Sequence, residues 1–138
     1  MIKNEYLKNN EGVFPTGKLN EGYRQFFIGD SYLHGLITDH PNIGIYNVTF
    51  EPGCRNNWHL HTEGQILLVT GGEGWYQEEG KKAQKLKTGD VVNIPANIKH
   101  WHGAVKDSWF SHLAISININ GNKTEWFEAV EDKEYGKL

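Results

Sequence analysis

Short runs of β-favouring residues, separated by turn sequences, are the feature that most restricts the fold of this 138-residue chain. The turns are EPG at 51–53, TGG at 70–72, EEGKK at 78–82 and TGD at 88–90. Many short strands at roughly even spacing are typical of a sandwich or barrel of antiparallel strands. We therefore expect an all-β protein whose strands include QFFI, IGIYNVTF, QILLVT, GWYQ, AQKLK, VVNIP and HLAISINI.

The length suits one domain with a real core and is too short for two ordinary domains. Residues 1–25 carry little pattern and are expected to form an N-terminal arm or strand region, with the domain proper at 26–138. Only the C-terminus has helical character. There KTEWFEAVEDKEY offers Thr124 as an N-cap, with Phe127 and Val130 at helical spacing, so we expect a short C-terminal helix.

Charge and leader content restrict the partners and the compartment. The formal net charge is −3 and no basic cluster is present, which argues against nucleic acid or an anionic membrane as the main partner. The first residues are polar and lack the apolar core of a signal peptide, and no apolar run approaches the ~20 residues of a spanning helix. The single cysteine, Cys54, excludes an internal disulfide, and we expect it to be inert. A cytoplasmic protein with a small-molecule partner is expected.

The segment WHLHTEGQ at 58–65 has a geometry that favours metal binding. On a strand, residues i and i+2 face the same side about 6.5–7 Å apart, so His59 and His61 can point two imidazoles at one place. The turn-like residues 62–64 then allow Gln65 to begin the next strand beside them. A glutamine at the head of an apolar run needs a polar partner if it is buried.

A second histidine pair lies in IPANIKHWHGA, where His100 and His102 repeat the same spacing around Trp101. Downstream, WFSHLAIS alternates, so that His112 and Ser116 share one strand face. If Val48 faces inward from IGIYNVTF, the same alternation turns Tyr46 inward. The alternative for each of these histidines is a polar or structural role without a metal.

These positions resemble the two motifs of the cupin family. Gly53 to Gly72 has the form G-x5-H-x-H-x3-Q-x6-G, and Gly89 to Ala104 has the form G-x5-P-x-N-x2-H-x3-A. The family patterns are G-x5-H-x-H-x3,4-E-x6-G and G-x5-P-x-G-x2-H-x3-N. The departures are Gln65, Asn97 and Ala104 in place of glutamate, glycine and asparagine.

From about Val48 to Tyr135 the chain is similar to small single-domain cupins that include bacterial hydroxynitrile lyases. The resemblance implies a double-stranded β-helix, or jelly-roll barrel, that forms a homo-oligomer, a dimer or tetramer. It also implies one divalent metal per chain, with Mn(II) favoured and Fe(II), Ni, Co or Zn as alternatives. It makes the metal ligands His59, His61, Gln65 and His100. It further implies His102 and His112 as pocket residues that are candidates for proton transfer.

The uncharged amide of Gln65 bears on the chemistry. Three neutral imidazoles and an amide leave a divalent ion with its full +2 charge, which favours a bound alkoxide or hydroxide. Such a site is less suited to the higher oxidation states used in oxygen activation. We therefore expect a lyase that polarises a hydroxyl or carbonyl substrate, with His102, His112 and Tyr46 as catalytic candidates. The alternatives are a metal-dependent oxygenase and a non-enzymatic cupin that binds a small ligand.

Overall fold

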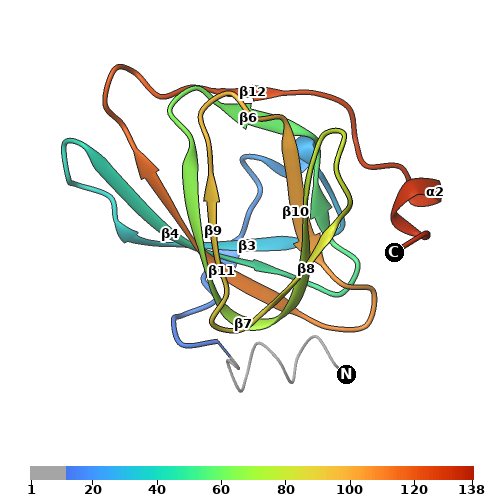
Figure 1. Cartoon of the computed structure of the whole chain (residues 1–138). Coiled ribbons are helices and arrows are strands. Elements are labelled where there is room, and N and C mark those ends of the chain that lie inside the picture. The colour runs from blue at the N-terminus through green and yellow to red at the C-terminus, as the bar shows by residue number, and fades with distance from the viewer. Residues whose placement is uncertain (1–11) are drawn as a thin grey trace.

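The computed structural model describes residues 12–138, and their strands form one curled antiparallel sheet (Figure 1). The strands are β1 (Lys18–Leu19), β2 (Phe27–Ile28), β3 (Ser31–Ile37), β4 (Ile43–Phe50), β5 (Arg55–Asn56), β6 (His59–His61), β7 (Gln65–Glu78), β8 (Gln84–Lys87), β9 (Val91–Ile94), β10 (His100–Ala104), β11 (Phe110–Ile117) and β12 (Thr124–Trp126). A 3₁₀ turn, η1 (Arg24–Phe26), and one short helix, α2 (Asp132–Tyr135), complete the described part of the chain. The all-β jelly-roll prediction with a short C-terminal helix is confirmed.

The long strand β7 joins the two halves of this sheet. Its first half pairs with β9 and β11, and its second half pairs with β8 and β10. Gly72 lies between the halves at φ +66, and a Cβ there would lie 1.7 Å from the carbonyl oxygen of Trp109. The prediction of a turn at 70–72 was wrong, because these residues form an irregularity inside one continuous strand, opposite a register shift at Ser111/His112.

The core fills the inside of the curled sheet with the inward-facing residues of β4, β7, β9 and β11. Phe50, Leu67 and Phe110 are fully buried there. Cys54 is also fully buried, and burial raises the pKa of its thiol, as expected for an inert cysteine. The alternation seen in the sequence thus separates an apolar interior from the outer face.

The C-terminal segment differs from the helix expected to begin at Thr124. Residues Thr124–Trp126 form β12, which pairs with β6 so that Trp126 lies opposite His59. The Trp126 ring stacks on Phe26 with centroids 4.4 Å apart. The strand is favoured over the helix because it completes the backbone hydrogen bonding of β6 and lets an aromatic ring pack. The spacing of Phe127 and Val130 alone provides neither of these contacts.

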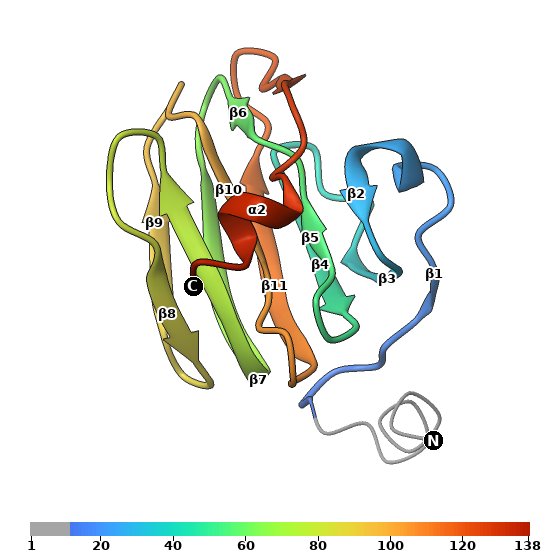
Figure 2. The same ribbon diagram turned by 90° about the vertical axis from the view of Figure 1, so that its right-hand side faces the viewer.

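The helix α2 lies against the outside of the sheet, next to β5 and β10, where Arg55 holds it (Figure 2). The buried Arg55 guanidinium donates to the Val130 carbonyl through Nε (3.0 Å) and Nη2 (2.7 Å). It also lies 4.2 Å from the Tyr135 ring centroid, and the Tyr135 hydroxyl donates to the carbonyl of Ala104. Arg55 therefore attaches the C-terminal segment to the barrel.

The N-terminal segment is attached at its described end. Strand β1 pairs with β3, and the Asn47 side chain donates to the carbonyl of Pro15 over 2.9 Å. Residues 1–11 of the predicted arm lie outside the described residues, and the boundary at residue 25 stays a prediction. Within residues 12–138, neither helical segment has the length and apolar character needed to span a membrane.

We predict that Arg55→Met lowers the free energy of unfolding by about 2–4 kcal/mol, because a charged donor to a buried carbonyl is lost. Asp132→Asn serves as the control: the Asp132 side chain is 92% exposed, and its ion pair with Arg55 should contribute less than about 1 kcal/mol. Urea unfolding of the two variants tests this. Equal destabilisation by both substitutions would contradict the assignment of Arg55.

Candidate metal centre

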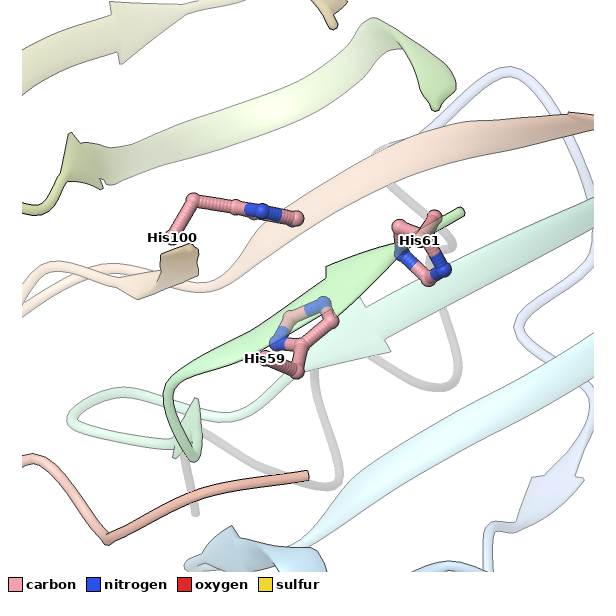
Figure 3. Close-up of side chains that lie close together, drawn as sticks. All are labelled: His59, His61 and His100. Atoms are coloured by element: carbon pink, nitrogen blue, oxygen red, sulfur yellow. The ribbon is translucent and has the colours of Figure 1, made fainter. Parts of the chain in front are cut away.

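Three buried histidines from two neighbouring strands form a compact cluster. Strands β6 and β10 pair antiparallel with His59 opposite His100, and strand alternation turns His61 to the same side as His59. One ring nitrogen from each of the three lies within 4.8 Å of the other two (Figure 3). The H-x-H spacing and the cross-strand register together produce this arrangement.

The outer ring nitrogens are hydrogen-bonded in a way that leaves the inner ones free. The Nδ1 contacts are His59 to Asn57 O (2.8 Å), His100 to Ile98 O (2.8 Å) and His61 to Thr124 Oγ1 (3.0 Å). A carbonyl accepts only from N–H, so His59 and His100 carry their proton on Nδ1 and keep a lone pair on Nε2. The Nε2 atoms of His61 and His100 are buried and make no hydrogen bond. This pattern is the one metal-ligating histidines show, and the residues present fit a metal ion.

Burial keeps these three imidazoles neutral. It lowers the pKa of His59 well below its usual range, and the neighbouring histidines lower it further. Burial and His100 lower the pKa of His61 to about 4, and the pKa of His100 is lowered by burial as well. Neutral imidazole is the form that binds a cation.

Gln65 begins β7 beside this cluster and lines the same cavity as His59 and His61. Its Nε2 donates to Ser116 Oγ over 3.2 Å. The sequence expectation that residues 62–64 turn and Gln65 starts the next strand is confirmed. The Gln65 amide is therefore in a position to supply a fourth metal ligand.

His102 and His112 form a second pair beside the cluster, with the ring centroid of His102 5.5 Å from that of His59. His112 Nε2 lies 3.1 Å from His102 Nδ1, so an N–H of one ring donates a hydrogen bond to the other ring. The Asn56 side chain accepts from the His102 backbone N–H at 2.9 Å, and its Nδ2 lies 3.3 Å from His102 Nε2. Both histidines are buried, and burial lowers the pKa of His102 strongly and that of His112 to about 4. The pair lies at the cavity, as predicted, and its catalytic role stays a prediction.

The cavity that these groups share has a volume of about 290 Å³, near the lower limit for small-molecule sites. Tyr46 lines it and is 37% exposed, which fits a position near its mouth. The cross-strand neighbours of Tyr46 are Gly35 and Ala114, and these small residues leave room for the ring. Tyr46 thus faces inward as predicted, while its role in catalysis stays a prediction.

Three residues of the site were missed from the sequence: Asn56, Thr124 and Trp126. Asn56 gave no signal, since it lies in a two-residue strand next to a turn. Thr124 and Trp126 were interpreted as parts of a helix, whereas their strand carries one side chain to His61 and the other to His59. Local sequence patterns could not have found them, because the pairing of β12 with β6 joins distant parts of the chain.

We predict that His59→Ala and His100→Ala each weaken metal binding strongly. Loss of a residue that only hydrogen-bonds to a metal ligand costs roughly 10–100-fold in affinity, and loss of a ligand itself should cost more. Elemental mass spectrometry of protein purified from one metal-supplemented culture measures the loss. His34→Ala, which removes a histidine of β3 outside the cluster, is the matched control. Full metal content in both cluster variants would overturn the site.

Comparison with known proteins agrees with this architecture. Residues 46–115 match the family model for the cupin domain. The chain is 46% identical over 89 residues to an (R)-mandelonitrile lyase of Granulicella tundricola, a match that covers 64% of this chain and 68% of that protein. It is 31% identical over 89 residues to an acireductone dioxygenase of Acidiphilium cryptum, covering 62% of this chain and 47% of that protein.

A solved structure extends the similarity to nearly the whole chain. A cupin-like protein of Thermotoga maritima superposes with a TM-score of 0.84 at 44% identity, covering 91% of this chain and 95% of that one. Together with the match to the family model over residues 46–115, this shows that the chain belongs to the cupin family.

Proposed function

We propose that this protein is a metal-dependent lyase that cleaves a carbon–carbon bond next to a hydroxyl group, with a cyanohydrin as the substrate class. The observation that carries the proposal is the buried three-histidine cluster with a neutral amide, Gln65, at its side. The similarity to a protein named (R)-mandelonitrile lyase supports the same reaction class. Mn(II) is the favoured metal, and a homo-oligomer is the expected assembly.

The charge of the ligand set supports lyase chemistry. His59, His61, His100 and Gln65 contribute no negative charge, since the histidines are held neutral by burial. A divalent ion held there supplies a Lewis acid that polarises the substrate oxygen. A carboxylate in place of Gln65 would halve the net charge of such a site and weaken that polarisation.

The cavity walls suit a small substrate with an apolar substituent. Val48, Phe50 and Ala114 line it, as does Phe27, whose ring centroid lies 6.4 Å from that of Trp126. Apolar burial there would hold the substituent and leave the hydroxyl directed at the histidines. This orientation brings the hydroxyl proton toward His102.

In this proposal the proton moves through His102. A ring nitrogen of His102 accepts the hydroxyl proton, and the electrons of the O–H bond form the carbonyl as the carbon–carbon bond breaks. The electron pair of that bond leaves with cyanide, which takes up the proton and departs as HCN. The contact of 3.1 Å between His112 and His102, together with Asn56, fixes the ring that moves the proton.

The acireductone dioxygenase similarity favours oxygenase chemistry as a second candidate. That match spans less than half of the dioxygenase, and the neutral amide of Gln65 counts against it because a carboxylate better supports oxidised metal. Oxygen consumption with an enediol substrate distinguishes the two reactions.

We predict that Mn(II)-loaded protein releases benzaldehyde and HCN from mandelonitrile in stoichiometric amounts and consumes no oxygen. His59→Ala protein, treated in the same way, provides the background rate. Bound metal with no cleavage above that background across aromatic and aliphatic cyanohydrins would overturn the lyase proposal. Oxygen uptake in its place would favour the dioxygenase candidate.

We predict that Gln65→Glu retains metal and lowers the rate of cyanohydrin cleavage by at least about tenfold, which is roughly 1.4 kcal/mol of barrier. The physical reason is the added negative charge, which reduces the polarisation of the substrate oxygen. Metal content and initial rates are measured on the same sample. An unchanged rate at equal metal content would show that the neutral amide has no role in the reaction.

A further inference from the structure

We infer that Ser116 is a positioning residue that fixes the side-chain amide of Gln65 with its carbonyl oxygen toward the three-histidine cluster. This inference rests on the proposed metal site. It concerns how the departure from glutamate at position 65 is accommodated by a neighbouring strand.

The two residues are brought together by the sheet. Strands β7 and β11 pair antiparallel with Ile66 opposite Ile115, which places Gln65 beside Ser116 on the next inward position. Both side chains line the cavity that His59 and His61 line. On the other side of β11, the residue opposite Ser116 is Gly44, so β4 presents no side chain to compete for the hydroxyl.

The chemistry of the amide makes its orientation decisive. An amide offers a carbonyl oxygen at one end and an NH₂ group at the other, and a hard cation binds the oxygen. A half-turn of the side chain exchanges the two ends and would direct N–H groups at the cation. The Gln65 Nε2 donates to Ser116 Oγ over 3.2 Å. With a cation at the cluster selecting the carbonyl oxygen, the hydroxyl of Ser116 stabilises that orientation by accepting from the NH₂ group left on the far side.

A carboxylate at position 65 would not need this partner. The two oxygens of a glutamate are equivalent, so either orientation presents a ligand atom. The hydroxyl of Ser116 should therefore matter for metal binding when residue 65 is glutamine and should matter little when it is glutamate. A residue that only supports the strand would matter equally in both cases.

The experiment is a double-mutant cycle on the full chain, with the dissociation constant for Mn(II) measured by competition with a chelator. We expect Ser116→Ala to weaken binding by about tenfold or more in the native background. In the Gln65→Glu background it should change binding by no more than about twofold, the usual error of additivity. Ser116→Thr keeps the hydroxyl and should bind Mn(II) like the native protein. Ser116→Val has the shape of threonine without the hydroxyl and should bind as weakly as Ser116→Ala.

Ser111→Ala is the matched control, since Ser111 lies on the same strand with its hydroxyl 3.0 Å from Thr49 Oγ1 on the outer side of the sheet. It should leave the Mn(II) constant unchanged, and urea unfolding of every variant separates loss of fold from loss of affinity. An equal effect of Ser116→Ala in both backgrounds, or no effect in either, would overturn the role of Ser116 alone. Failure of the native protein to bind Mn(II) would overturn the metal site and this inference together.

Discussion

The pairing of β6 with β10 at His59 and His100 is the contact on which the site depends, because it brings together buried imidazoles from two distant parts of the sequence. Burying several histidines is favourable only if they stay neutral and their ring nitrogens find partners. Backbone carbonyls and Thr124 meet this requirement on the outer side of the cluster. The inner Nε2 atoms of His61 and His100 remain without a protein partner, which is costly for a fold that had no ligand to place there.

The period-2 alternation made much of this site predictable from the sequence. It placed His59 with His61, and His100 with His102, on common faces before any strand order was known. The same alternation placed Tyr46 and Ser116 on the cavity side. Strand order could not be read in this way, because pairing between β6 and β10 is a long-range contact that local patterns do not encode.

The errors came from positions where tertiary pairing overrides local signals. The glycines at 71–72 are typical of a turn, yet Gly72 lies inside β7, where the absence of a side chain lets the backbone of Trp109 come close. The spacing of Phe127 and Val130 is typical of a helix, yet β6 needs a neighbour and β12 supplies it. By contrast, Asn97 in place of the motif glycine has a simple reason: it adopts φ +63, a left-handed conformation that asparagine tolerates better than other side chains.

The replacement of glutamate by Gln65 connects the chemistry of the site to its packing. A neutral ligand preserves the charge of a bound cation, which suits polarisation of a substrate oxygen. It also introduces an orientation problem that a carboxylate lacks, and a hydroxyl on the adjacent strand β11 resolves it. Under the proposed role of Ser116, its hydroxyl matters only while residue 65 is glutamine, so a change to glutamate would leave position 116 free to vary. The fold itself carries no such information, since the same jelly roll accommodates lyase and dioxygenase chemistry alike.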